Sequence, residues 1–435
     1  MSEPIRSVPA ADATDSAVFT PSPGVAAGSP SADAMSTTLT RAGRHFPGTV
    51  NTANLPVHRA STVLFDSLAQ ADSVGRQTMT GDRHASTYGT VGTATTMALM
   101  DALAEIEGAG HACRAALMPS GLAAITTALW AFLRPGDHLL MPDSVYGPAR
   151  TFAQGLLTDF GVETTFYDAA APIDRLIRDD TRVIYLESPG SYTFEIQDVP
   201  AICALARSRG IVTMIDNAWA SPVFARPFDW GVDVSLLPLT KYWSGHSDVL
   251  MGAAVVRESL WPTFWPVMRQ LGICVGGDDA WLILRGLRTA EVRLRRHEAS
   301  ALQVARWLQA RPEVARVLHP ALPEFPQHAL WKRDFTGSSG LFSFELAPGV
   351  LAGDAARQAA QLAALCEQRR HFGIGYSWGG FESLIMPARI ATLRSARPWQ
   401  GGQLIRLHIG LESPDDLIAD LTRGFEQLAA VGAGH

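Results

Sequence analysis

The chain has 435 residues, and at roughly 100 to 200 residues per domain this length predicts two or more domains. Its 47% apolar composition supplies a hydrophobic core and excludes a disordered or fibrous class for most of the chain. A net charge of −6 without a basic block argues against nucleic acid or a membrane surface as a partner. The four cysteines are widely spaced and form no C-x-x-C pair, so we predict neither a disulfide framework nor a metal site.

No apolar run approaches the roughly 20 residues that a membrane-spanning helix needs. The N-terminal residues also lack a charged segment followed by an apolar one, which a secretory signal requires. We therefore expect a cytoplasmic protein.

The first part of the chain is poor in core-forming residues. Residues 1–40 are half Ala, Ser and Pro and are predicted to be a disordered tail. Residues 41–92 show few clear periods and are predicted to form an extended arm. The arm ends in the glycine-spaced run Tyr88–Thr93.

Residues 93–285 alternate short apolar runs with helix-length amphipathic stretches. Strands that are buried on both faces and alternate with helices are typical of a mostly parallel sheet covered by helices, so we predict a large α/β domain with a seven-stranded sheet. The expected strands are Ala115–Pro119, His138–Met141, Thr164–Tyr167, Val183–Leu186, Ile211–Ile215, Val234–Leu239 and Met251–Val256.

Residues 286–435 are predicted to form a smaller C-terminal α/β domain. A long helical pattern covers Ala280–Gln309, and another over Asp415–Ala429 closes the chain. Between them lie four runs that are typical of strands, namely Val314–Leu318, Leu341–Leu346, Phe372–Tyr376 and Leu404–Ile409.

Lysine is rare in this sequence, since 34 of the 36 basic residues are arginine and only Lys241 and Lys332 are lysine. An amine can lose its proton and attack a carbonyl carbon, whereas a guanidinium group cannot. Each lysine is therefore a candidate nucleophile, although Lys332 in the charged run Trp331–Asp334 has the setting of a surface lysine.

Polar residues follow most of the strands predicted for the large domain. Ligands of open α/β sheets lie beyond the carboxyl ends of the strands, so these residues are expected to gather at one edge of the sheet. They are Ser120, Gly121, Asp143, Ser144, Tyr146, Glu187, Ser188, Asp216, Asn217, Thr240 and Lys241.

This set suits pyridoxal 5'-phosphate (PLP). The aldehyde of PLP needs a lysine, its ring nitrogen needs an acid, its ring stacks on an aromatic side chain, and its phosphate binds N–H groups at the start of a helix. Lys241, Asp216, Tyr146 and the helix that begins after Ser120 meet these needs. Taken singly, each of these residues also fits an ordinary structural role such as capping or packing.

Four stretches carry a resemblance to a known family: Tyr185–Ser191, Met214–Trp219, Thr240–Tyr242 and Gly245–Asp248. They resemble the cystathionine β-lyase branch of the Cys/Met-metabolism PLP enzymes, and the similarity runs from about Thr38 to the C-terminus. The resemblance implies a PLP-dependent transferase fold of type I, like that of aspartate aminotransferase.

The resemblance also implies roles for individual residues. Lys241 would form the Schiff base and move the proton, Asp216 would pair with the ring nitrogen, and Tyr146 would stack on the ring. Gly121, Leu122 and Thr240 would bind the phosphate. The substrate would contact Arg406, Ser377, Trp378 and Tyr88, with Arg406 binding its α-carboxylate. A planar guanidinium on a strand also suits bidentate carboxylate binding without the resemblance.

The same resemblance implies a homo-oligomer, a tetramer built as a dimer of dimers, in which Tyr88 reaches the cofactor of the neighbouring subunit. The family usually has an arginine two residues after that tyrosine, but this chain has Thr90. We hypothesise that Arg83 or Arg76 takes over the phosphate contact.

The implied reaction is β-elimination of cystathionine to homocysteine, pyruvate and ammonia, a step toward methionine. The related γ-lyase and γ-synthase reactions, and a broad cysteine-conjugate β-lyase, remain alternatives. Family members that act at the γ carbon usually show Thr-Asn-Pro after Glu-Ser-Pro, whereas Gly190, Ser191 and Tyr192 follow here. This departure favours the β-type reaction.

Two alternatives from other classes remain. Gly375–Gly379 spells G-x-S-x-G, the pattern of a serine-hydrolase nucleophile elbow, in which Ser377, Glu382 and His408 would be the triad. Only 56 residues follow Gly379, too few for the remaining strands of that fold. A binding protein without catalysis is the other alternative, but such a protein would not need a reactive amine.

Overall fold

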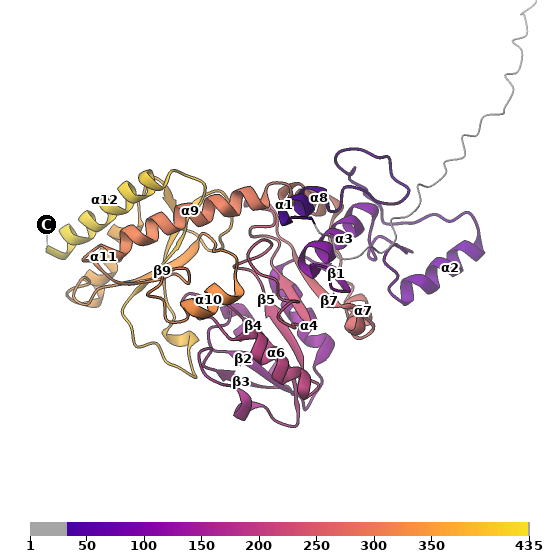
Figure 1. The fold of residues 1–435 in the computed structure, drawn as a ribbon, viewed down its shortest axis with the longest axis horizontal. Helices are drawn as coiled ribbons and strands as arrows, with labels where there is room; N and C mark the ends of the chain where they lie inside the picture. The colour runs from indigo at the N-terminus through magenta and orange to yellow at the C-terminus, as the bar shows by residue number, and fades with distance from the viewer. Residues whose placement is uncertain (1–32, 434–435) are drawn as a thin grey trace, which may run out of the picture.

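The computed structural model describes residues 33–433, which form a large domain and a smaller C-terminal domain side by side (Figure 1). Residues 1–32 of the predicted tail lie outside the described residues. Among the residues that are described, no helix is long and apolar enough to cross a bilayer.

The large domain contains a seven-stranded sheet in the order β1-β7-β6-β5-β4-β2-β3. Strands β2 to β6 run parallel to one another, and β7 is antiparallel to both β1 and β6. The predicted seven-stranded, mostly parallel sheet is therefore confirmed. Its strands are β1 (Cys113–Met118), β2 (His138–Pro142), β3 (Glu163–Tyr167), β4 (Thr181–Glu187), β5 (Val212–Asp216), β6 (Val234–Leu237) and β7 (Gly252–Arg257).

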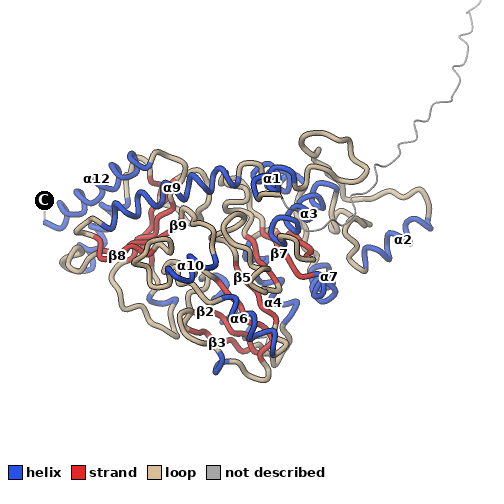
Figure 2. Tube along the Cα trace, viewed as in Figure 1, coloured by secondary structure: helices blue, strands red, loops and turns tan. Residues whose placement is uncertain are grey.

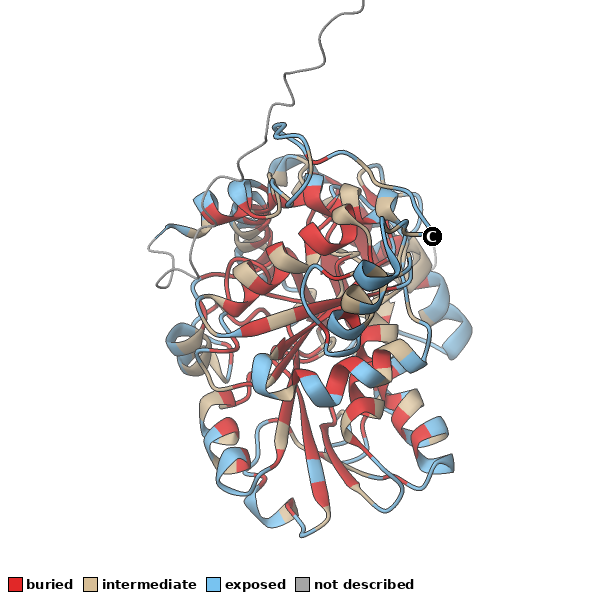
Figure 3. Ribbon diagram, turned by 90° about the vertical axis from the view of Figure 1, so that its right-hand side faces the viewer, coloured by how far each residue is buried: buried red, intermediate tan, exposed pale blue. Residues whose placement is uncertain are grey.

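Helices cover both faces of this sheet, as Figure 2 shows in blue around the red strands. Alternate side chains of a strand point to opposite faces. In β2, Leu139 and Met141 pack with α4 (Gly121–Phe132) and α7 (Trp261–Gln270), whereas Leu140 packs with α6 (Val199–Ser208). The red interior in Figure 3 corresponds to these doubly buried strands. The other helices of this domain are α3 (Ala94–Gly108), α5 (Gly147–Phe152) and α8 (Gly277–Leu287).

The C-terminal domain has a five-stranded sheet in the order β10-β11-β12-β9-β8, one strand more than predicted. The missed strand contains Pro387, which argues against a strand because proline cannot donate to a ladder. Its neighbour β10 pairs only with Ser383 and Leu384, so the β10 side of the strand is open at Pro387. The strands are β8 (Val314–Leu318), β9 (Leu341–Leu346), β10 (Phe372–Gly373), β11 (Ser383–Ala388) and β12 (Leu404–His408).

Helices α9 (Ala290–Gln309), α11 (Ala355–Cys366) and α12 (Pro414–Ala433) pack on one another and on this sheet, and α10 (His328–Asp334) lies between β8 and β9 in the chain. The two domains share a hydrophobic core. The indole N–H of Trp219 in the large domain donates to the carbonyl of Leu341 in β9 over 2.9 Å. The position of one domain therefore depends on the other.

The prediction of a single helix over Ala280–Gln309 is wrong, because two separate helices, α8 and α9, cover this segment. A Cβ atom on Gly286 would lie 2.5 Å from the carbonyl oxygens of Trp243 and Ser244, so the α8 end packs directly on the segment after Lys241. The Arg293 side chain then satisfies the freed carbonyl of Gly286 over 2.8 Å. This packing interrupts a periodic pattern that looks continuous in the sequence.

The N-terminal segment is more regular than predicted. Helix α1 (Met35–Arg41) crosses the predicted boundary of the tail at residue 40. Leu39 is buried in the shared core, and Arg288 donates to its carbonyl oxygen, which explains why this part of the tail is ordered. The arm predicted to be extended contains α2 (Leu68–Met79), whose first turn is capped by the Ser67 side chain.

Candidate active site

A cavity of about 350 Å³ lies where the carboxyl ends of the large-domain strands meet a loop of the C-terminal domain. Eight of the residues that line it were predicted from the sequence as cofactor or substrate contacts. These are Gly121, Leu122, Tyr146, Asp216, Thr240, Lys241 and, from the C-terminal domain, Ser377, with Trp378 beside it. Of the predicted edge set, Ser120 and Glu187 also line this cavity. Asp143 and Ser144 line a second cavity instead, and Ser188 and Asn217 line neither of the two.

One end of the cavity is formed by the start of α4. Ser120 caps this helix by accepting the N–H of Ala123 over 3.1 Å. A Cβ atom on Gly121 would lie 2.9 Å from Cβ of Pro238, and one on Gly252 would lie 2.2 Å from the carbonyl oxygen of Ser120. The glycines therefore keep the turn tight. Unpaired N–H groups in the first turn of a helix favour an anion such as a phosphate.

Thr240 secures the opposite side of that turn. Its hydroxyl accepts the N–H of Met251 over 3.0 Å and donates to the Met251 carbonyl over 3.2 Å. These bonds join the end of β6 to the start of β7, next to Gly252.

Lys241 places its amine at the centre of the cavity. The ammonium group Nζ donates to Oγ of Ser377 over 2.5 Å and lies 5.0 Å from the ring centre of Trp378. Burial, together with the positive charge of Arg406, lowers the pKa of Lys241 to about 8, and Asp216 opposes this shift. The amine therefore loses its proton far more easily than an ordinary lysine.

The backbone after Lys241 is held by the neighbouring helix. Nη1 of Arg293 in α9 donates to the carbonyl of Tyr242 over 2.9 Å. A Cβ atom on Gly245 would lie 1.8 Å from the same nitrogen, so this approach requires glycine there. Gly245 has φ +71°, which glycine adopts without strain.

Two buried carboxylates face the cavity from adjacent strands, because Glu187 at the end of β4 pairs in register with Asp216 at the end of β5. Asp216 accepts the N–H of Ala218 over 3.0 Å. Burial raises the pKa values of both groups, and the charge of Asp216 raises that of Glu187 further. A cation placed against Asp216, such as a protonated pyridine ring, would relieve this cost.

Glu187 is a site residue to which the sequence reasoning assigned no role. Its Oε2 accepts the backbone N–H of Tyr146 over 2.7 Å, and its Oε1 accepts the hydroxyl of Ser191 over 2.7 Å. The signal was its position at the end of a buried strand beside Asp216. Glu187 thus fixes the backbone of Tyr146, whose side chain is 42% exposed at the cavity wall.

Arg406 lies on β12 and is buried. Its Nη2 donates to the carbonyls of Gly375 and Ser377 over 3.1 and 3.3 Å, and its guanidinium lies 5.9 Å from the ring centre of Tyr192. Arg406 does not line the cavity itself, but its positive charge acts on the Lys241 amine. A buried guanidinium near the cavity is suited to binding a carboxylate.

Tyr88 does not line this cavity. It lies on the arm, is 50% exposed, and forms an isolated bridge with Thr62. Arg83 donates from Nη2 to the carbonyl of Cys113 over 2.9 Å within the same chain. The cross-subunit role of Tyr88 and the substitute for an arginine at Thr90 stay predictions.

The serine-hydrolase alternative is wrong. Ser377 lies in a loop between β10 and β11 rather than at a strand-to-helix turn, and its hydroxyl accepts from Lys241. Both ring nitrogens of His408 bond to backbone groups, and Glu382 accepts the hydroxyl of Ser247. The three residues therefore form no proton relay.

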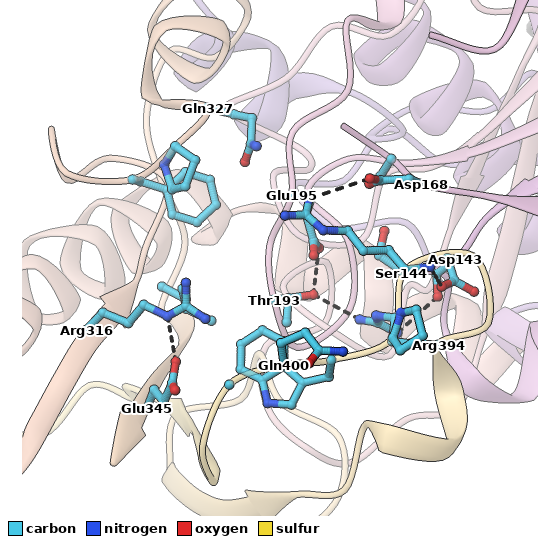
Figure 4. A pocket seen from close by; sticks show the side chains of 18 of the residues that line it. Asp143, Ser144, Asp168, Thr193, Glu195, Arg316, Gln327, Glu345, Arg394 and Gln400 are labelled. Carbon is cyan, nitrogen blue, oxygen red and sulfur yellow. Dashed lines mark hydrogen bonds and ion pairs between the residues drawn. The ribbon is translucent and has the colours of Figure 1, made fainter. Parts of the chain in front are cut away.

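A second cavity, of about 580 Å³, lies between the domains (Figure 4). Two ion pairs lie among its lining side chains, Arg316–Glu345 at 2.5 Å and Arg397–Asp168 at 3.5 Å. Arg394 donates to the carbonyls of Asp143 and Ser191 and so ties the C-terminal domain to the edge of the large sheet. This cavity lies at a polar part of the interface between the domains, and Lys241 does not line it.

The smaller cavity fits PLP on the chemistry of its lining residues. The tight glycine turn before α4 suits the phosphate, the buried carboxylate of Asp216 suits the ring nitrogen, and Lys241 offers an amine of lowered pKa for the aldehyde. No cluster of three metal-ligating side chains occurs within residues 33–433.

Residues 36–426 match the model of the Cys/Met metabolism PLP-dependent enzyme family. A putative cystathionine β-lyase of Rhizobium johnstonii is 48% identical over 87% of this chain and 92% of its own length. The cystathionine β-lyase of Escherichia coli is 42% identical over 91% of this chain and 98% of its own length. The structure of a cystathionine γ-synthase from Xanthomonas oryzae superimposes with a TM-score of 0.80 at 31% identity, covering 92% of this chain and all of that one.

Proposed function

The chain belongs to the Cys/Met metabolism family of PLP-dependent enzymes, and from this premise we propose that it cleaves the bond between sulfur and the β carbon of cystathionine. With water, the products are homocysteine, pyruvate and ammonia. The single observation that carries the proposal is the Lys241 amine, which lies between the carboxylate of Asp216 and the Ser377 and Trp378 side chains.

The side chains support this reaction through binding and proton transfer. When bound, PLP supplies an electron sink for the charge that develops at the substrate α carbon. Arg406 can bind the α-carboxylate and orient that carbon toward Lys241. A pKa of about 8 leaves a larger fraction of Lys241 unprotonated at neutral pH than for an ordinary lysine, and the unprotonated amine can accept the α proton. Tyr146, fixed by Glu187, offers a stacking surface for the ring.

The two relatives compared by sequence, at 48% and 42% identity, are named as β-lyases, which supports reaction at the β carbon. The γ-synthase whose structure was compared is less similar, at 31% identity. The products separate the two reactions, because γ-elimination of cystathionine releases 2-oxobutyrate instead of pyruvate.

We further propose a homotetramer, a dimer of dimers, in which Tyr88 enters the site of a neighbouring subunit. Support comes from the arm, where the large apolar side chains of Val50, Leu64, Leu68 and Met79 are 70% to 89% exposed, since a concentration of exposed apolar side chains marks a surface for a protein partner. Sedimentation of the purified protein tests the assembly, and a monomer at micromolar concentration would contradict it.

We also propose a cytoplasmic location, which cell fractionation tests.

The experiment that tests the function compares Lys241→Ala with Lys332→Ala. Lys332 is the other lysine of the chain and lies exposed on α10, so its variant is a matched control. We expect wild type and Lys332→Ala to show a yellow absorption band with PLP and to form pyruvate from cystathionine, and Lys241→Ala to do neither. A colourless wild-type protein, or 2-oxobutyrate as the product, would contradict the proposal.

A further inference from the structure

The loop of residues 374–382, between β10 and β11, covers the reactive amine. Ser377 and Trp378 of this loop contact Nζ of Lys241, as described above. Gly379 lies so close to the Lys241 backbone that a Cβ atom on it would be 2.9 Å from the Lys241 carbonyl carbon. Its φ of +92° also favours glycine. The position of this loop therefore determines the surroundings of the amine.

Strand β12 holds the loop at both ends. Arg406 binds the first half, through the carbonyls of Gly375 and Ser377. Two residues later on the same face of the strand, His408 binds the second half. The N–H of Gly379 donates to Nε2 of His408 over 3.0 Å, and Nδ1 of His408 lies 3.0 Å from the carbonyl oxygen of Glu382.

These two contacts require one form of the imidazole. Because Nε2 accepts a hydrogen bond, it carries no proton, and the proton on Nδ1 can then be donated to the Glu382 carbonyl. The ring is buried and packs against the rings of His297 and Tyr242, with centroids 5.4 and 6.1 Å away. Burial lowers the pKa of His408 well below its usual range, which keeps the ring neutral.

We propose that His408 is a positioning residue for the reactive amine: by bonding Gly379 and Glu382, it holds Ser377 and Trp378 against Lys241. The inference rests on the proposed function, because it assumes that Lys241 is the amine that joins PLP. It assigns a function to a residue that otherwise reads as part of a buried strand.

The test uses His408→Phe and His408→Gln in the full-length protein loaded with PLP. Phenylalanine keeps a flat ring but offers neither hydrogen bond, whereas the glutamine amide has an oxygen that can accept and an NH2 group that can donate. We expect His408→Phe to lower kcat by about tenfold or more with a smaller change in KM. The reason is that the loop loses both hydrogen bonds and no longer holds Ser377 and Trp378 against Lys241. We expect His408→Gln to recover part of this loss.

A spectroscopic readout separates positioning from general loss of stability. The midpoint pH of the visible PLP band reports the surroundings of Lys241, and we expect it to shift by about half a pH unit or more in His408→Phe. His297→Phe is the matched control, because His297 is also buried and bonds the carbonyl of Ile409 rather than the loop. We expect its band to keep the wild-type midpoint.

The outcomes are distinguishable. An active, yellow wild-type protein with an unchanged kcat and midpoint in His408→Phe would overturn the inference while leaving the proposed function intact. An equal shift in His297→Phe would also overturn it, because the effect would then belong to the core as a whole. A wild-type protein that forms no band with PLP would overturn the proposed function itself.

Discussion

A buried acid beneath the active site offers a quantitative test of the packing. Glu107 of α3 is 3% exposed, and its Oε1 accepts both Nδ2 of Asn217 over 2.8 Å and the hydroxyl of Ser235 over 2.5 Å. Burial raises the pKa of Glu107 from 4.5 to about 7. The substitution Glu107→Gln removes the charge, and an amide oxygen at the Oε1 position can keep both hydrogen bonds.

The sign of the pH effect follows from the proton count. Between pH 4.5 and about 7, Glu107 stays protonated in the folded protein but loses its proton in the unfolded chain. The free energy of unfolding therefore falls as pH rises through this window. At 1.36 kcal/mol per pH unit, the loss is about 3 kcal/mol. Because glutamine does not titrate, Glu107→Gln should gain about 3 kcal/mol relative to wild type between pH 4.5 and pH 8.

Urea unfolding followed by circular dichroism, at fixed protein and PLP concentrations across this pH range, measures the difference. Glu105→Gln is the matched control on the same helix, since Glu105 is more exposed and pairs with Arg41. Its effect on the free energy of unfolding should stay within about 1 kcal/mol, because an ion pair near the surface contributes little. A difference between Glu107→Gln and wild type that is the same at both ends of the range would refute the reasoning.

Five further variants test other parts of the structure. Asp216→Asn should reduce kcat by about a hundredfold or more, because a neutral amide stabilises a protonated ring nitrogen poorly; steady-state kinetics at saturating PLP measure this. Arg406→Lys should raise KM about tenfold while the visible band persists, since one ammonium cannot replace a bidentate guanidinium; an unchanged KM would contradict the carboxylate role. Fluorescence titration with PLP of Arg76→Ala and Arg83→Ala should show about tenfold weaker binding in one of them if that arginine replaces the contact missing at Thr90, and no loss in either would end the idea. Leu39→Ala should lower the free energy of unfolding by about 2 to 5 kcal/mol, because Leu39 is 1% exposed in the core.

Much of the fold and the site could be predicted because buried parallel strands appear in the sequence as short apolar runs. Each run ends in a polar residue, and parallel strands bring those ends to one edge. For this reason Asp216 and Lys241 could be placed together although 24 residues separate them in the chain. Strand β11 and the division between α8 and α9 were not predicted, because both depend on contacts with distant segments. Pro387 is tolerated where β10 does not pair with β11, and Gly286 packs on the backbone of Trp243 and Ser244.

Glu107 and His408 could not be predicted for a related reason. Glu107 lies within an ordinary helical pattern, and nothing local indicates that Asn217 and Ser235 point toward it. His408 lies in an apolar strand, where a buried histidine usually has only a packing role. Their contacts come from segments more than 25 residues away, so only the tertiary structure identifies them.

The division of the active site between the two domains has a mechanical consequence. Lys241 is anchored to the large sheet, whereas Ser377, Trp378 and Arg406 move with the C-terminal sheet. A hinge motion that opens the interface would separate the amine from its hydroxyl and indole neighbours and from the guanidinium that depresses its basicity. The proton affinity of this nitrogen therefore depends on the packing between the two domains as well as on the sheet that carries it.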